Sequence, residues 1–354
     1  QAMANSLREN SILIEETNKQ DINNAIKLNL SSALLDRLKL DTKRVQAIAN
    51  SVEEIISQPE VVGAITESKT RQDGLIIEKQ RNPIVVIWMI FESRPNVVVD
   101  CSALAIKSGN CIILKGGKEA QATNALLGKI IREAIQEFIP IDVVQLIETR
   151  DDVSKLLTQV NLIDVIIPRG GEGLIKHVCE NSKVPVLAHY KGLCHIYIDE
   201  AAEADQAIGI ALNAKASRPG VCNAMETLLV HQNFDQDSTL KLLNSFNEKQ
   251  TELRVCHKLF DKFSAQVSYL KHATEQDWDT EYLDNILSIK EVESIDSAID
   301  HINQFGSHHT EAILSTNQEN IMLFQNSVDA SSIMVNASTR FNDGGEYGLG
   351  AELG

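Results

Sequence analysis

The stretch at residues 110–117 reads NCIILKGG, and it decides the fold class. Its apolar run is typical of a buried strand and its two glycines of a tight turn, and residues 120–138 continue with the apolar spacing of a long helix. A strand that leads through a short turn into a helix is the repeating unit of sheets with parallel strands. The stretch therefore predicts an α/β protein.

The same unit recurs further along the chain. Residues 143–147 and 163–167 predict two more strands, each followed by a helix, at 151–159 and 174–180. After a strand at 195–199 the alternation resumes with a helix at 201–214 and a strand at 227–231. This spacing predicts parallel sheets covered on both faces, with ligands bound where strand carboxyl ends meet helix amino ends.

The segment before the first unit has a different pattern. Residues 6–58 carry apolar side chains at helical spacing, which predicts a helical N-terminal segment. Apolar stretches at 75–77 and 84–90 flank charged residues and the turn-prone Asn82-Pro83, which predicts two strands joined by a turn. A chain of 354 residues, 43% of them hydrophobic, is long enough for two domains.

The composition excludes several classes of partner. The chain has 33 Lys and Arg against 49 Asp and Glu, so its formal net charge is −16. A field of this sign repels nucleic-acid phosphates and anionic lipids. No run of residues reaches the roughly 20 apolar positions of a membrane-spanning helix. We therefore expect neither a nucleic-acid nor a membrane partner.

The six cysteines are scattered and form no Cys-x-x-Cys pair. This usage predicts reduced thiols in a cytoplasmic protein, without a disulfide scaffold or a metal site. His308 and His309 near Glu311 could suggest a metal site, but adjacent histidines point in different directions, so a solvated loop is the preferred interpretation. The acidic run at residues 277–284 is interpreted as a solvent-facing turn.

Two glycine turns are candidate phosphate cradles, because each joins a strand to a helix whose amino end presents unpaired N–H groups. They are Lys115-Gly116-Gly117 and Arg169-Gly170-Gly171. Neither matches a complete dinucleotide or P-loop motif. An ordinary strand-to-helix turn therefore remains an equal alternative.

Cys222 is the candidate nucleophile among the cysteines. It follows Lys215 and Arg218 in a polar, glycine-containing loop, and cationic neighbours favour the reactive thiolate. Most of the other cysteines stand in apolar strands or helical stretches, where an inert buried thiol is expected. The residues alone leave an ordinary loop thiol as the more frequent alternative for Cys222.

The loop around Cys222 also carries a resemblance. Residues 218–231, RPGVCNAMETLLVH, resemble the active-site signature of the gamma-glutamyl phosphate reductase family, a branch of the aldehyde dehydrogenase superfamily. Further segments resemble that family in the same order, over essentially the whole chain. They are 92–97 (ESRPNV), 107–110 (KSGN), 167–171 (IPRGG), 280–284 (TEYLD) and 335–341 (VNASTRF).

The resemblance implies an enzyme that reduces L-glutamate 5-phosphate with NADPH to L-glutamate 5-semialdehyde and phosphate, through a cysteine thioester, in proline biosynthesis. It implies two Rossmann-like parallel-sheet domains with an active-site cleft between them. Residues 1–190 are then the N-terminal helices and NADP-binding domain, residues 191–342 the catalytic domain, and residues 343–354 the start of a C-terminal return segment. Family members usually continue after the stretch that matches residues 348–354 with a segment containing Lys-His-Ala-Arg and a closing strand.

The resemblance also implies roles for single residues. Cys222 attacks the acyl carbon, and Asn96 binds substrate or steadies the oxyanion. Arg218, Arg340 and Arg94 hold the phosphate and carboxylate ends of the substrate, although some of these arginines could instead pair only with acidic side chains. The cofactor is implied to contact Lys115, Gly116, Gly117, Arg169, Gly170, Gly171 and Glu281.

The hydrolytic members of the superfamily place a general-base Glu just before the strand predicted at 195–199. Residues 186–192, VLAHYKG, contain no carboxylate, which fits a thioester that exchanges with phosphate rather than with water. His189 in this segment is interpreted as structural, with proton transfer as the alternative. The resemblance further implies a homo-oligomer and a transient contact with glutamate 5-kinase. The competing hypotheses are another acyl-phosphate or CoA-acylating aldehyde dehydrogenase, and a catalytically silent protein of the same fold.

Overall fold

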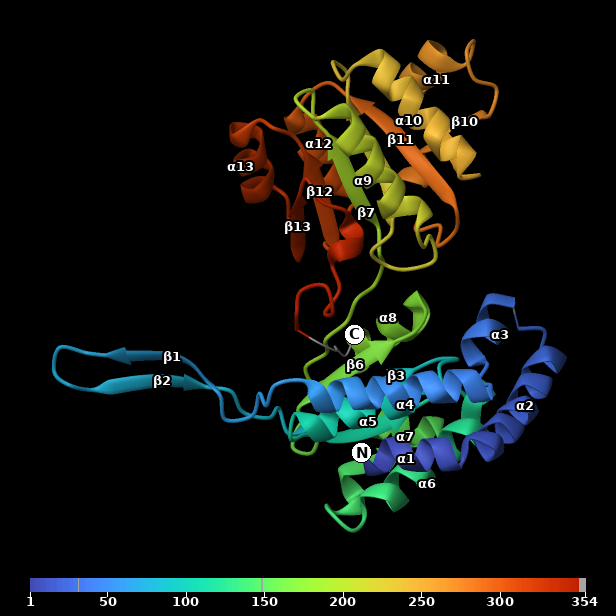
Figure 1. Ribbon diagram of the computed structural model, residues 1–354, viewed down its shortest axis with the longest axis vertical. Helices are drawn as coiled ribbons and strands as arrows, with labels where there is room; N and C mark the ends of the chain where they lie inside the picture. The colour runs from blue at the N-terminus through green and yellow to red at the C-terminus, as the bar shows by residue number, and fades with distance from the viewer. Residues whose placement is uncertain (31, 148, 350–354) are drawn as a thin grey trace. The chain divides into compact units, whose positions relative to one another are not determined.

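The computed structural model describes residues 1–30, 32–147 and 149–349. These residues form two compact units, residues 1–189 and residues 190–349 (Figure 1). Each unit has its own sheet and its own apolar core.

A four-stranded sheet organises the first unit, with the strand order β5-β4-β3-β6 and every pairing parallel. The central strand β3 buries its side chains from Ile87 to Phe91, as a strand covered on both faces requires. This confirms the parallel sheet expected for the first half of the chain. Its elements are β3 (Val86–Phe91), α5 (Asn96–Lys107), β4 (Cys111–Lys115), η1 (Lys118–Ala120), α6 (Gln121–Ile135), η2 (Ile141–Val143), β5 (Val144–Leu146), α7 (Arg150–Leu156), β6 (Val165–Arg169) and α8 (Glu172–Asn181).

The strand order of this sheet reverses at β3. The chain proceeds from β3 to β4 and β5 in one direction and then crosses to β6 on the other side of β3. Ligands of open α/β sheets bind in the crevice that such a reversal opens, outside the strand carboxyl ends. Both predicted glycine turns lie at this edge, because they follow β4 and β6.

Four helices precede the sheet, as the helical spacing of residues 6–58 predicts. They are α1 (Ala2–Glu9), α2 (Ser11–Lys27), α3 (Ser32–Leu38) and α4 (Thr42–Ser57). Asp21 of α2 is buried and accepts hydrogen bonds from the amide and the hydroxyl of Thr123 in α6, at 2.8 and 2.7 Å. The contact satisfies an open N–H group near the start of α6 and joins the helices to the sheet layer. Within the described ranges, no helix has the length and apolar character needed to cross a bilayer.

A separate hairpin projects from the first unit (Figure 1). Its strands β1 (Ile65–Thr70) and β2 (Ile76–Gln80) pair antiparallel, and every residue in both is exposed. The apolar stretches at 75–77 and 84–90 thus belong to different sheets, and the hairpin turn is formed earlier, at Asp73-Gly74, where Gly74 has a φ of +87°. The sequence pattern missed β1 because residues 65–70 are mostly polar, without an apolar run.

The second unit contains a seven-stranded sheet with the order β10-β9-β11-β8-β7-β12-β13. Each of its strand pairs is parallel, as the alternation of strands and helices predicts. Its elements are β7 (Cys194–Ile198), α9 (Ala204–Ala216), β8 (Met225–His231), α10 (Gln236–Glu248), β9 (Glu252–Val255), α11 (His257–Phe263), β10 (Leu270–His272), η3 (Glu275–Asp279), β11 (Ile286–Val292), α12 (Ile295–Phe305), β12 (Thr310–Leu314), α13 (Gln318–Ser327), β13 (Ser332–Val335) and η4 (Thr339–Phe341).

The acidic run at 277–284 is not simply a solvent-facing turn, so that interpretation is wrong in part. Asp277 and Trp278 are buried, each at 4% exposure. Asp277 Oδ1 accepts hydrogen bonds from the Arg254 guanidinium at 2.6 Å and from the Tyr282 hydroxyl at 2.7 Å. An arginine from a neighbouring strand neutralises the carboxylate, which the local sequence could not reveal.

His301 of α12 is a buried imidazole in the second unit. Lys290 Nζ lies 2.9 Å from its Nδ1 atom, and the His195 and Trp278 rings lie 5.5 and 5.6 Å from its own ring centre. Burial, reinforced by electrostatic interactions with His195 and Lys290, lowers the pKa of His301 from 6.5 to about 2. The unfolded chain therefore binds a proton below pH 6.5 that the folded chain does not, and stability falls as the pH falls.

We expect the substitution His301→Gln to weaken this pH dependence, because Gln does not titrate and can still accept from Lys290. The slope between pH 6.5 and 5 should decrease by at most about 1.4 kcal/mol per pH unit. Urea denaturation at several pH values measures it, with the exposed His308→Gln as the matched control. An unchanged slope in His301→Gln would contradict this account of the buried imidazole.

Candidate active site

Cys222 lies in the loop of residues 217–224, between α9 and β8, and its side chain is half-buried. Because β7, β8 and β12 are parallel neighbours, their first residues share one edge of the sheet. These residues are Cys194, Met225 and Thr310. The Cys222 loop therefore lies at the amino-terminal edge of the second sheet, whereas the general rule for α/β sheets places ligands at the carboxyl edge.

Backbone contacts fix the position of Cys222. The buried Cys194 thiol donates to the Cys222 carbonyl oxygen at 3.3 Å. Gly192 packs so closely that a Cβ atom on it would lie 2.2 Å from this oxygen and 2.5 Å from the Cys222 Cα. Only glycine allows this approach, because both blocking atoms belong to the backbone. Gly192 and the Cys194 thiol thus hold the backbone of Cys222 in place.

The other buried cysteines are poor candidates for a thiolate. Burial raises the pKa of the Cys101 thiol, and burial together with Glu311 raises that of the Cys194 thiol. A raised pKa keeps a thiol protonated and unreactive at neutral pH. This agrees with the expectation of inert thiols at these two positions.

Lys215 does not serve as a cation beside the thiol, contrary to the interpretation from sequence. Its ammonium group is fully buried and forms an ion pair of 2.6 Å with Glu226, which is also fully buried. The pair joins the last turn of α9 to the start of β8, and so bridges the two ends of the Cys222 loop. Arg218 remains exposed in the loop itself.

Glu281 belongs to a segment that is held by the Glu226 carboxylate. Glu226 Oε1 accepts a hydrogen bond from the amide of Leu283 at 3.2 Å. Leu283 has a φ of +51°, a conformation that a leucine adopts only when its surroundings impose it. A Cβ atom on Gly220 would lie 3.5 Å from the Leu283 carbonyl oxygen, so this segment adjoins the Cys222 loop.

Arg340 is anchored on Asn223, the residue after Cys222. Its guanidinium donates to Asn223 Oδ1, and Asn223 Nδ2 donates back to the carbonyl oxygens of Arg340 and Asn342 at 3.4 and 3.0 Å. The Nε atom of Arg340 is buried and has no hydrogen-bond partner among the described residues. The structure therefore brings Arg340 to the Cys222 loop with a donor still available for an anion.

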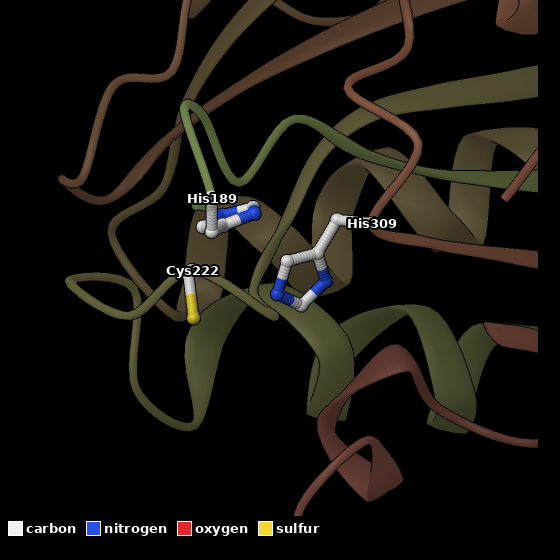
Figure 2. Close-up of side chains that lie close together, drawn as sticks. All are labelled: His189, Cys222 and His309. Atoms are coloured by element: carbon white, nitrogen blue, oxygen red, sulfur yellow. The ribbon is translucent and has the colours of Figure 1, made fainter. Parts of the chain in front are cut away.

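His309 is a neighbour of Cys222 that the sequence patterns did not indicate. Its Nδ1 atom lies 2.6 Å from Thr310 Oγ1 and 3.7 Å from Cys194 Sγ. A nitrogen of its ring lies within 4.8 Å of Cys222 Sγ, and Figure 2 shows one ring nitrogen turned toward that sulfur. The loop before β12 comes here because β12 pairs with β7.

The residues of the metal cluster that the sequence could suggest face different partners in the structure. The suggested cluster of His308, His309 and Glu311 does not converge, because His308 faces Asp329 and Glu311 binds the amide and ring of His195. Taken by itself, neither unit contains three described His, Cys, Asp or Glu residues that could share an ion. His189, drawn in Figure 2, is the last residue of the first unit.

The first glycine turn of the first unit borders a hollow at the carboxyl end of β4. Lys115 Nζ donates to the Gly116 carbonyl oxygen at 2.5 Å. Cβ atoms on Gly116 and Gly117 would lie 2.1 Å from Asn124 Nδ2 and 2.0 Å from Glu119 Oε1. A side chain at either position would therefore displace the end of the Asn124 or the Glu119 side chain. The hollow is lined by Phe91, Leu114, Lys115, Gly116, Gly117, Lys118, Gln121, Asn124, Ala125, Leu146 and Ile147.

The second glycine turn lies at the crevice between β3 and β6. The amide of Gly171, which precedes α8, donates to Glu92 Oε2 at 2.8 Å. A Cβ atom on Gly170 would lie 2.5 Å from the same oxygen. The Glu92 carboxylate therefore lies at the amide where the sequence predicts a phosphate. This amide N–H group thus donates to an anionic group. Arg169 ends β6 beside it and is partly exposed.

The segment after β3 carries the remaining candidates. Arg94 is half-buried there, and Asn96 begins α5. The Asn96 side chain donates to Asp100 Oδ2 at 2.9 Å, and burial raises the pKa of Asp100. The candidates of the first unit thus follow β3, β4 and β6 at one edge of its sheet, while Cys222, Arg218, Arg340 and Glu281 belong to the second unit.

Comparisons with known proteins agree on one family. The aldehyde dehydrogenase family matches residues 4–285. The gamma-glutamyl phosphate reductase of Nautilia profundicola is 47% identical over 99% of this chain and 85% of its own length. The crystal structure of the gamma-glutamyl phosphate reductase of Thermotoga maritima has a TM-score of 0.93 at 41% identity, over 99% of this chain and 85% of that one. An acetylating aldehyde dehydrogenase from Geobacillus thermoglucosidasius shares the fold, with a TM-score of 0.65 at 19% identity, over 98% of this chain and 81% of its own.

Proposed function

The chain belongs to the gamma-glutamyl phosphate reductase branch of the aldehyde dehydrogenase family, and on this premise we propose that it reduces L-glutamate 5-phosphate to L-glutamate 5-semialdehyde, with release of phosphate. The family membership confirms the resemblance and the fold inferred from the sequence. The observation that carries the proposal is the half-buried Cys222, held by Gly192 and Cys194 beside Arg340.

The acyl chemistry is assigned to the second unit. The Cys222 thiolate adds to the acyl carbon, and the bond from that carbon to the phosphate oxygen breaks, so that phosphate leaves with the electron pair. Arg340 and Arg218 are suited to the negative charges of the substrate, because guanidinium groups bind phosphate and carboxylate in a fixed geometry. A thioester divides a difficult reduction into two easier steps. Asn96 and Arg94 of the first unit are proposed to bind the substrate as well.

A nicotinamide cofactor, NADPH, is assigned to the first unit. The hollow at β4 fits its phosphate groups, since Lys115 and Lys118 line it and the glycines leave the backbone bare. The turn at Arg169, Gly170 and Gly171 offers an amide that already holds an anionic group. Glu281 is proposed to bind the nicotinamide ribose. A bound NADPH would supply the hydride that reduces the thioester, and the carbon–sulfur bond would then break, leaving the aldehyde and Cys222 as a thiolate.

Exchange with phosphate rather than with water is supported by the sequence that precedes β7. Residues 186–192 carry no carboxylate that could activate a water molecule. A CoA-acylating enzyme of the superfamily is the second candidate function, because it would use the same cysteine. The charged Arg340 and Arg218 at the loop favour a small, multiply charged acyl phosphate over a bulky CoA thioester.

The proposal is tested by the reverse reaction. We expect the protein to reduce NADP when given L-glutamate 5-semialdehyde and phosphate, to be silent when CoA replaces phosphate, and to lose the signal in Cys222→Ala. Absorbance at 340 nm follows the reduced cofactor. Turnover with CoA would establish the second candidate. Turnover in a mixture that contains neither phosphate nor CoA would indicate a hydrolytic dehydrogenase. If no mixture changes the absorbance, and the protein also fails to oxidise NADPH with the acyl phosphate in the forward direction, the protein is catalytically inactive.

Self-association is proposed on the β1–β2 hairpin. Ile65, Ile76 and Ile77 on it are 54%, 62% and 51% exposed, and an isolated two-stranded hairpin is marginally stable in water. A second copy of the chain is the partner that would cover it, and light scattering of the Ile76→Lys variant would then show a smaller particle. We further propose a cytoplasmic location, where the six free cysteines stay reduced, and a transient contact with glutamate 5-kinase that crosslinking would detect.

A further inference from the structure

We propose that Asn223 is a positioning residue: it holds the guanidinium of Arg340 at the Cys222 loop, so that Arg340 binds the phosphate group of the substrate. Arg218 is then left to bind the carboxylate at the other end of the substrate. This assignment rests on the proposed function and deepens it, because the family resemblance leaves open which arginine meets which charge and implies no role for Asn223. All of these residues belong to the second unit.

Asn223 connects the Cys222 loop to the segment that carries Arg340. It is buried, and its side-chain amide donates to the carbonyl oxygens of Arg340 and Asn342 at 3.4 and 3.0 Å. Its side-chain oxygen accepts a hydrogen bond from the Arg340 guanidinium, and its backbone carbonyl oxygen accepts one from the Thr339 hydroxyl at 2.7 Å. The residue after Cys222 is therefore joined to residues 339–342 through both its side chain and its backbone.

The segment that carries Arg340 is itself fixed at both ends. The amide of Arg340 donates to the Ser338 hydroxyl oxygen at 3.2 Å, at the start of η4. Asn342 Nδ2 donates to Thr310 Oγ1 at 2.6 Å, which ties the end of the segment to the first residue of β12. The backbone of Arg340 is thus held in place, and the hydrogen bond to Asn223 orients its side chain.

The hydrogen bond to Asn223 uses Nη1 of the guanidinium and leaves another edge of this group unpaired. That edge consists of Nε and Nη2, neither of which has a hydrogen-bond partner among the described residues. Nε is also buried, and a buried donor without a partner is unfavourable. Two parallel N–H groups on one edge of a guanidinium match two oxygen atoms of a phosphate. Arg340 therefore keeps an edge suited to a phosphate group.

The two arginines differ in how firmly they are held. Arg218 is exposed in the loop before Cys222, and within the described part of the chain its side chain has neither a hydrogen bond nor an ion pair. The phosphate of an acyl phosphate is attached to the reacting carbon and gains negative charge as the carbon–oxygen bond breaks. Donors that are fixed in advance stabilise a developing charge best. The anchored Arg340 thus suits the phosphate, and Arg218 suits the carboxylate, whose charge does not change.

The reverse reaction separates the two charges, because phosphate and L-glutamate 5-semialdehyde are added independently. We expect Arg340→Ala to raise the KM for phosphate about 10- to 100-fold and to change the KM for the aldehyde little, since hydrogen bonds to a charged group are lost. Arg218→Ala should mainly raise the KM for the aldehyde. Asn223→Ala should raise the KM for phosphate about tenfold. The matched control is Asn303→Ala, at an exposed position of α12.

A double variant shows whether Asn223 acts through Arg340. When Arg340→Ala is already present, Asn223→Ala should raise the KM for phosphate no further, whereas a purely structural role would add its own effect. Urea denaturation of each variant measures the stability that each change costs. Phosphate binding is also measured without turnover, as the rise in unfolding midpoint that inorganic phosphate causes. This rise should be smaller in Arg340→Ala than in the wild type.

An unchanged KM for phosphate in Arg340→Ala would overturn the assignment, and so would a rise in the KM for the aldehyde alone. Additive effects of Asn223→Ala and Arg340→Ala would remove the positioning role of Asn223. If the wild type shows phosphate-dependent turnover, these results leave the proposed function in place. If it shows none, the proposed function fails, and the midpoints decide on the phosphate site: a smaller rise in Arg340→Ala supports it, and an equal rise overturns it.

Discussion

Replacing Gly192 with alanine is expected to lower kcat by about 10²-fold or more, although the change adds only a single methyl group. The new Cβ would lie 2.2 Å from the Cys222 carbonyl oxygen and 2.5 Å from its Cα. Both are backbone atoms, so no side-chain rotation can relieve the clash. The Cys222 loop must shift, and a nucleophile displaced by about 1 Å loses its alignment with the acyl carbon.

Gly209 provides the matched control for this experiment. It lies in α9, and a Cβ on it would have no atom within 4 Å. Gly209→Ala should therefore keep full activity and stabilise the helix by up to about 1 kcal/mol. The reverse assay and thermal unfolding of both variants make the comparison. If Gly192→Ala retains wild-type kcat, the close packing behind Cys222 has no catalytic consequence and this part of the account is wrong.

The second large effect is expected from the buried ion pair of Lys215 and Glu226. The substitution Glu226→Ala leaves the Lys215 ammonium uncompensated in a fully buried position. Removal of one partner from such a pair typically costs about 3–5 kcal/mol. It also removes the acceptor of the Leu283 amide, and so releases the strained segment that carries Glu281. We expect a destabilised protein with weaker cofactor binding.

A double variant separates these two consequences. Lys215→Met combined with Glu226→Leu replaces the charges with apolar side chains of similar size, which is often neutral for stability. Urea denaturation should show that most of the stability returns. The KM for NADP should stay raised, because the Leu283 amide still lacks its acceptor. A double variant with both normal stability and normal KM would show that Glu226 does not position the Glu281 segment.

Much of the fold could be predicted from local patterns. The runs at 111–114 and 163–167 are mostly apolar, strand-forming residues that lead toward glycine turns, so their identity as parallel strands follows from short-range chemistry alone. The β1–β2 hairpin was missed because residues 65–70 are polar and owe their pairing to the Asp73-Gly74 turn. The acidic run at 277–284 was misread because Arg254, which neutralises Asp277, comes from another strand.

Those parts of the candidate site that lie within one short segment of the chain could be predicted from the sequence. The loop around Cys222 carries its own signature, and so do the glycine turns after β4 and β6. Three features depend on strand order and could not be read from spacing: His309 beside the thiol, Gly192 behind it, and Lys215 turned away to Glu226. The Lys215–Glu226 pair could have been suspected from the sequence. Glu226 is the only acidic residue in the buried strand METLLVH, and a buried carboxylate needs a partner.

The most direct test of the central claim is to trap the acyl enzyme. The chain is mixed with L-glutamate 5-semialdehyde and NADP in the absence of phosphate, and then digested and analysed by mass spectrometry. We expect a burst of reduced cofactor close to one equivalent per chain and an acyl adduct on the peptide that contains Cys222, and phosphate should discharge the adduct. Steady turnover without phosphate, or an adduct on any other cysteine, would contradict the account.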